Sequence, residues 1–166
     1  MKYSPLKTFR VKNFRNIGDV TIDFTESPIV VLTGDNEAGK TSIVKAFGVW
    51  GAHMGPRDQK DYIRDNTNGF GIAGDLMDGT LVVRIKNNAS NMYSVEKPGE
   101  EAWRTTTIDD NKVPVKVAEV IGLKIEPETK ELLQIRTYED KLLFVFTTAS
   151  TNYKVMYNAL KVEQLT

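Results

Sequence analysis

The residues best suited to chemistry form one short loop, Gly34–Thr41, with the sequence GDNEAGKT. Its spacing follows the pattern G-x-x-x-x-G-K-[ST] without a mismatch, and loops of this pattern cradle phosphate groups. Gly34 and Gly39 permit backbone angles that a β-carbon would resist. The backbone N–H groups can then turn inward and form an anion nest at the start of a helix. The sequence therefore predicts a phosphate-binding loop.

The side chains at the end of this loop indicate a nucleotide and a metal ion. Lys40 would place a positive charge near the β- and γ-phosphates, Thr41 would offer a hydroxyl to Mg²⁺, and Ser42 would offer one to the α-phosphate. The carboxylates of Asp35 and Glu37 would repel phosphate, so we expect both to point outward. The predicted ligands are ATP and Mg²⁺.

Such a loop needs a strand before it and a helix after it, and both flanks fit. Pro28–Leu32 is a continuous, largely β-branched run, which predicts a strand covered on both faces. From Ser42 to Trp50, apolar residues recur at helical spacing. A chance glycine turn is the alternative, and it is disfavoured because the motif and both flanks agree.

Outside the loop and its two flanks, the sequence pattern predicts mostly short strands. Asp78-Gly79 between two alternating runs is a strong hairpin signal. Residues 51–68 read as irregular, and the helix at the end has no stop signal. The predicted strands are Thr8–Lys12, Val20–Phe24, Ile72–Leu76, Thr80–Lys86, Met92–Glu96 and Trp103–Ile108; Pro114–Ile121 is predicted as a helix, Leu142–Phe146 as strand or helix, and the segment from Asn152 onward as helix.

Composition excludes several classes of protein. The 166 residues include 40% hydrophobic and 27% charged residues, which is ordinary for a globular domain. Lys and Arg number 22, as do Asp and Glu, so the net charge gives no polyanion signal. The absence of cysteine excludes a disulfide framework, and the lone histidine, His53, excludes a His-cluster zinc site. No apolar run approaches the length of a membrane span, so we expect a cytoplasmic protein.

Three segments together resemble the opening of the SMC-like repair ATPases, which include the SbcC-type exonuclease subunit, RecF and RecN. The first is residues 9–17 (FRVKNFRNI), the second is Val20–Phe24, and the third is residues 30–42 (VVLTGDNEAGKTS). The resemblance is clear over residues 6–50 and looser over 58–65 and 131–166. It implies an α/β fold: the N-terminal lobe of an ABC-type P-loop ATPase head, with an antiparallel β-subdomain.

The resemblance also implies roles for individual residues. Arg15 matches a phosphate-contacting arginine, and Arg64 falls where the family approaches the base. A glutamine of the family that reaches Mg²⁺ and the attacking water aligns with Thr137, whereas Gln134 is off register. The ATP-binding residues implied are Arg15, Gly34, Asn36, Glu37, Ala38, Gly39, Lys40, Thr41, Ser42 and Arg64, and the metal contact is Thr41.

In this family a coiled coil and a C-terminal lobe follow, and that lobe carries the signature motif and the Walker B acids. Neither motif occurs in residues 1–166. We therefore expect a single ATP-binding N-terminal lobe that ends where a coiled coil begins and needs its C-terminal lobe for hydrolysis. The implied partners are that lobe or a second head, a nuclease subunit and double-stranded DNA, with no membrane. The alternatives are a stand-alone nucleotide-binding regulatory module, a RecF-like protein and a transport ABC domain.

A run of basic residues opens the chain, with no acid before Asp19. Its members are Lys2, Lys7, Arg10, Lys12 and Arg15. The strip could face DNA phosphates, or it could be the solvated face of a strand. Trp50 and Trp103 are expected in the core.

Overall fold

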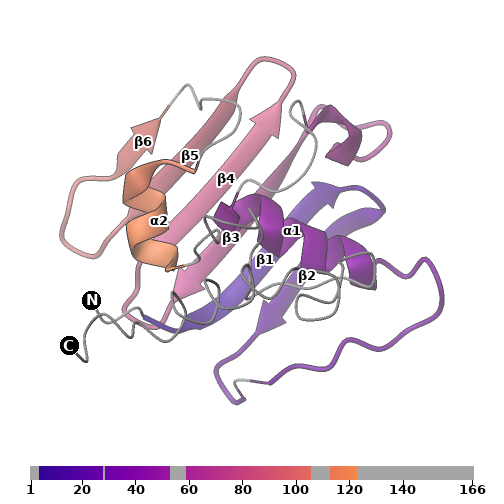
Figure 1. Cartoon of the computed structure of the whole chain (residues 1–166), viewed down its shortest axis with the longest axis horizontal. Helices are drawn as coiled ribbons and strands as arrows, with labels where there is room; N and C mark the ends of the chain where they lie inside the picture. The colour runs from indigo at the N-terminus through magenta and orange to yellow at the C-terminus, as the bar shows by residue number, and fades with distance from the viewer. Residues whose placement is uncertain (1–3, 28, 53–58, 106–112, 123–166) are drawn as a thin grey trace, which may run out of the picture. The chain divides into compact units, whose positions relative to one another are not determined.

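In the computed structural model, the described residues are 4–27, 29–52, 59–105 and 113–122. They form a six-stranded antiparallel sheet with two α-helices (Figure 1). The strand order across the sheet is β2-β1-β3-β4-β5-β6. The strands are β1 (Leu6–Phe14), β2 (Ile17–Asp23), β3 (Gly69–Leu76), β4 (Leu81–Asn87), β5 (Asn91–Glu96) and β6 (Trp103–Thr105). This confirms the predicted mixed α/β fold with its antiparallel β-subdomain.

Alternation along the strands decides which face of the sheet is buried. In β1, Phe9 and Val11 are buried whereas Arg10 and Lys12 are exposed, as the sequence predicted. Val11 pairs with Val20 of β2 on one side and with Ile72 of β3 on the other. β1 is therefore an interior strand, joined to β3 across more than fifty residues of sequence. The predicted Asp-Gly hairpin between β3 and β4 is confirmed, with Gly79 at φ 82°.

Two helices cover the buried face of the sheet. They are α1 (Lys40–Ala52) and α2 (Val115–Ile121), and Figure 1 shows both on the same side. Gly122 ends α2 in the left-handed conformation, and its N–H donates to Ala118 O at 3.0 Å, as expected for a glycine cap. A single 3-10 turn, η1 (Lys60–Tyr62), precedes β3.

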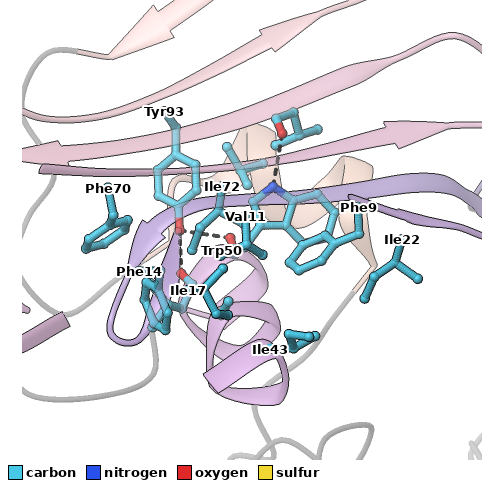
Figure 2. Packing of buried hydrophobic residues seen from close by; sticks show 14 of the residues in the cluster. Phe9, Val11, Phe14, Ile17, Ile22, Ile43, Trp50, Phe70, Ile72 and Tyr93 are labelled. Carbon is cyan, nitrogen blue, oxygen red and sulfur yellow. Dashed lines mark hydrogen bonds between the residues drawn. The ribbon is translucent and has the colours of Figure 1, made fainter. Parts of the chain in front are cut away.

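Aromatic packing fixes α1 against the sheet (Figure 2). The rings of Phe9 and Phe47 are stacked with centroids 3.6 Å apart. Trp50 meets Phe9 edge-on at 5.5 Å. Trp50 is 2% exposed, and its Nε1 donates to Val82 O at 3.0 Å. Trp50 is thus a core residue, as predicted, and its indole N–H is satisfied by the backbone of β4. Because α1 carries the phosphate loop at its N-terminus, this packing sets where the loop lies.

The strand predicted at Pro28–Leu32 is wrong for the residues that the structure describes. Residues 29–32 are in no strand, and Ile29 and Val31 are 77% and 78% exposed. The physical reason is that, among the described residues, the six strands pair only with one another, so a segment outside them has no ladder there for its N–H and C=O groups. Its β-branched composition predicted a buried strand, but burial requires a partner.

Other predicted boundaries shift modestly or lie outside the described residues. α1 begins at Lys40 instead of Ser42, and β1 extends to Phe14. Only Trp103–Thr105 of the predicted strand Trp103–Ile108 is described, and Trp103 is half-buried against the core. His53, Thr137, Leu142–Phe146 and the helix from Asn152 fall among the residues that are not described. No helix in the described part is long and apolar enough to cross a membrane.

Two glycines of β3 provide a matched test of the packing between α1 and the sheet. A β-carbon on Gly74 would overlap the ring of Trp50, whereas a β-carbon on Gly71 would meet nothing within 4 Å. We expect Gly74→Ala to destabilise the protein by about 1–3 kcal/mol, because overpacking forces the core to shift. Gly71→Ala should change the free energy of unfolding by less than about 1 kcal/mol. Urea unfolding measures both, and equal effects would contradict the described packing.

Candidate nucleotide-binding site

The predicted phosphate loop joins residues 29–33 to the N-terminus of α1 and holds three positive backbone angles. Gly34 has φ 147°, Glu37 67° and Gly39 98°. A β-carbon at Gly39 would lie 3.4 Å from Ile17 Cγ1, and one at Gly34 would lie 3.2 Å from Ala38 Cβ. Both glycines are therefore needed for their conformation, and Gly34 also has little room for a side chain. This is the backbone curvature that the sequence motif predicted.

The lysine of the motif lies across the loop that precedes it. Lys40 Nζ donates to the carbonyl oxygens of Gly34 and Asp35, each at 2.6 Å. Lys40 is also the first residue of α1, whose first backbone bond runs from Ile43 N to Gly39 O at 3.0 Å. The ammonium charge and the positive end of the helix dipole therefore lie in the same loop. Together they favour an anionic ligand.

The remaining motif residues differ in their exposure. Asp35, Asn36, Glu37 and Ala38 are exposed, whereas Gly39 is buried. Exposure of the two acidic side chains agrees with the expectation that they turn away from the backbone nest. Thr41 is half-buried at the start of α1. Contact of these residues with a nucleotide stays a prediction.

An asparagine that the sequence reasoning did not assign holds the loop in place. Asn16, in the turn between β1 and β2, donates from Nδ2 to Glu37 O at 2.5 Å. Its Oδ1 accepts a hydrogen bond from Ser42 Oγ at 2.7 Å. One amide thus links the strained middle of the loop to the first turn of α1. The Ser42 hydroxyl, predicted to reach the α-phosphate, is engaged with Asn16 here. In the sequence, the one feature that could have indicated a role for Asn16 is its position directly after Asn13-Phe14-Arg15, within the segment that resembles the repair ATPases.

Removing this amide should loosen the loop. We expect Asn16→Ala to weaken nucleotide binding roughly 5- to 150-fold, because two hydrogen bonds of about 0.5–1.5 kcal/mol each are lost. Asn87→Ala is a matched control: Asn87 Oδ1 caps the turn at Ala89 and Ser90, between β4 and β5. Titration calorimetry with ATP and Mg²⁺ should show normal affinity for the control. Unchanged affinity in Asn16→Ala would contradict the role of the amide.

The same turn brings the two predicted arginines into one region of the fold. Arg15 N donates to Tyr62 O at 2.8 Å, and Arg64 N donates to Asn13 O at 3.0 Å. The segment after η1 therefore lies along the end of β1, with Ile63 bridged to Phe14. Both arginine side chains are exposed, and the Arg15 guanidinium lies 6.0 Å from the Tyr62 ring centroid. The structure thus places both arginines around the turn whose Asn16 contacts the loop.

The basic strip is partly neutralised. Arg10 forms a two-pronged ion pair with Asp19, with Nη2 to Oδ2 at 2.8 Å and Nε to Oδ1 at 3.1 Å. This hydrogen bond from Arg10 lowers the pKa of the Asp19 carboxyl. Lys7, Lys12 and Arg15 are exposed in the structure, and Lys2 is outside the described residues. Arg10 therefore contributes less positive potential than its position in the sequence suggested.

Comparison with protein families gives one match that covers most of the chain. The profile of AAA_23, described as an AAA domain, matches residues 8–157. This chain belongs to that AAA domain family. The assignment supports the N-terminal region of an ABC-type P-loop ATPase, as the resemblance to the repair ATPases implied. The match begins in β1 and includes the phosphate loop of the AAA domain, Asn16 and both arginines.

Comparison with other proteins adds little to the family assignment. Curated protein sequences gave no significant match to this AAA domain. Among solved structures, one similar chain is the recombination mediator protein RecF with ATP, from the RecFOR pathway. Its sequence is 19% identical over 73% of this chain, the TM-score is 0.42, and the match spans only 31% of the RecF chain.

Proposed function

We propose that this AAA domain binds ATP with Mg²⁺ at the loop Gly34–Thr41 and serves as the N-terminal half of an ATPase head. The observation that carries the proposal is the loop itself: two glycines with positive φ, a lysine ammonium across the turn, and a helix N-terminus at its end. A nest of N–H groups next to a fixed cation suits a polyphosphate.

The residues of the loop fit a magnesium nucleotide. Gly34 and Gly39 have positive φ angles, which let the loop turn its backbone N–H groups toward a phosphate. Lys40 would exchange its two carbonyl acceptors for phosphate oxygens, which bind an ammonium more strongly because the bond is charge-assisted. The Thr41 hydroxyl would hold Mg²⁺, a hard cation that prefers oxygen ligands. The ion would neutralise charge on the phosphates.

Completion by a C-terminal lobe is the second part of the proposal. Ile29 and Val31 are exposed directly before the phosphate loop, although their composition suits a strand covered on both faces. A strand from the C-terminal lobe, or from a second head, would supply the missing ladder. The segment would then become the buried strand that the sequence predicted.

We further propose that the complete protein acts in DNA repair or recombination, as an SbcC-like ATPase with a nuclease subunit and double-stranded DNA as partners. The support is the resemblance of residues 6–50 to the repair ATPases and the family to which the chain belongs. Lys12, exposed on β1, is available for phosphate contact.

Arg15 tests the nucleotide site beyond the loop. If its guanidinium meets the γ-phosphate, Arg15→Ala should weaken ATP binding by about 1.5–3 kcal/mol, roughly tenfold or more, and ADP binding less. Arg10→Ala and Lys12→Ala, in the strand that precedes Arg15, are controls from the same basic run and should leave both affinities nearly unchanged. Calorimetric titrations with each nucleotide decide the matter. Equal small losses of affinity in all three variants would indicate a general electrostatic effect and would contradict a specific contact between Arg15 and the γ-phosphate.

A further inference from the structure

A glycine near the start of β2 makes room for the side chain of Arg64. A β-carbon on Gly18 would overlap Arg64 Nη1 and would lie 3.6 Å from Arg64 Cζ. Gly18 is not among the glycines with positive φ, so its backbone conformation would accept a side chain. A glycine inside a strand often marks the close approach of another group. At Gly18 that group is the Arg64 guanidinium.

The backbone of Arg64 is held by the strand beside it and by the turn that follows. Its N–H donates to Asn13 O at 3.0 Å. Its carbonyl oxygen accepts from Thr67 N at 3.1 Å and from Thr67 Oγ1 at 2.7 Å. A free arginine side chain samples many rotamers. Because the Arg64 main chain is fixed and its guanidinium lies against Gly18, this side chain is ordered before any ligand binds.

The position occupied by the guanidinium lies next to the phosphate loop. Gly18 follows Asn16 and Ile17 directly in the sequence. A β-carbon at Gly39 would lie 3.4 Å from Ile17 Cγ1 and 3.6 Å from Asn16 Oδ1. The segment from Asn16 to Gly18 therefore contacts the loop through its first two residues and Arg64 through its third.

The charge of Arg64 is not neutralised by the described part of the chain. There, its guanidinium forms no ion pair or hydrogen bond, whereas the guanidinium of Arg10 is paired with Asp19. Arg64 is exposed, and an arginine keeps its proton at neutral pH. Its N–H groups are therefore available to an anionic ligand bound at the neighbouring loop.

We propose that Gly18 is a positioning residue for nucleotide binding, which acts by holding the Arg64 guanidinium beside the phosphate loop. The inference rests on the proposed function, because it requires a nucleotide at Gly34–Thr41. An arginine that is already ordered loses less side-chain freedom when the ligand binds. A side chain at Gly18 would displace the end of Arg64 and disturb neither the backbone nor the core, because the overlap involves only the tip of a flexible side chain.

A double-mutant cycle tests this role by titration calorimetry of the full chain with ATP and Mg²⁺. Arg64→Ala should raise the Kd roughly tenfold or more, as expected for the loss of a charge-assisted contact. Gly18→Ala should raise it roughly two- to tenfold, the cost of ordering one long side chain on binding. The double variant should bind like Arg64→Ala alone, because Gly18 acts only through Arg64. Losses that multiply in the double variant would overturn the proposal, as would an unchanged Kd in Gly18→Ala.

Two controls separate this role from a general effect on the sheet. Gly71→Ala changes another strand glycine, at a position where a β-carbon would meet nothing within 4 Å, and should leave the Kd unchanged. Gly18→Ala should keep or raise the Tm, because alanine loses less conformational freedom than glycine on folding. A fall in Tm that accompanies the loss of affinity in Gly18→Ala would indicate a structural role and would contradict positioning of Arg64.

The same titrations distinguish failure of this inference from failure of the nucleotide site itself. If wild type binds no ATP, the proposed function is wrong and the positioning role of Gly18 is wrong with it. If wild type binds ATP and Lys40→Ala weakens binding, but Gly18→Ala and Arg64→Ala do not, the nucleotide site stands and only the positioning role is refuted.

Discussion

Lys40→Ala should weaken the binding of both ATP and ADP by at least about 1.5–3 kcal/mol, the usual worth of a charge-assisted contact. This corresponds to roughly a tenfold to hundredfold increase in Kd. The physical reason is that the ammonium is the only motif side chain that carries a positive charge, and it already lies across the loop on Gly34 O and Asp35 O. Titration calorimetry with each nucleotide and Mg²⁺ measures the loss.

Lys45→Ala is the matched control for this variant, because it removes a lysine from the same helix at a position beyond the loop. Its nucleotide affinities should stay within about twofold of wild type. Thermal unfolding of both variants checks that the fold is intact. Equal affinities of wild type and Lys40→Ala would refute the assignment of the phosphate site.

The second large effect concerns hydrolysis. We expect residues 1–166 alone to show negligible ATPase activity, because holding the phosphates does not by itself activate the attacking water. The sequence contains no LSGG-like signature and no apolar run leading into an Asp-Glu pair, and Thr137 stands where the family resemblance expects a glutamine. Adding the cognate C-terminal lobe should raise the steady-state rate by orders of magnitude, since preorganised charge is usually the largest catalytic contribution.

A steady-state phosphate-release assay with and without that lobe tests this expectation. The same assay on the complete head with added DNA measures whether DNA raises the rate further. Lys40→Ala with the lobe present is the control for contaminating activity. Robust turnover by residues 1–166 alone, abolished by Lys40→Ala, would show that a catalytic acid lies within this sequence. An unstimulated low rate with the lobe present would instead argue against the proposed head architecture.

Much of this protein follows from local sequence. The glycine and lysine spacing predicted a curved anion-binding loop, and Gly34 and Gly39 have the positive φ that it requires. Alternation predicted the buried side of β1 through Phe9 and Val11, and Asp78-Gly79 predicted the β3–β4 hairpin. These features are readable because backbone preference and side-chain periodicity act within a few residues.

The tertiary structure alone decided which groups meet. Asn16 and Ser42 are 26 residues apart, and no local pattern states that one amide joins them. The exposure of Ile29 and Val31 reflects the lack of a strand neighbour in the part of the chain that the structure describes, which their own β-branched composition cannot reveal. Arg84 falls in an alternating strand where a charge would be expected to face water, yet its register opposite Tyr93 and its bond to Gln59 place it inside. Which side chains are buried, and which groups form hydrogen bonds with each other, depends on contacts between segments distant in sequence. These contacts are defined only by the order of the strands in the sheet.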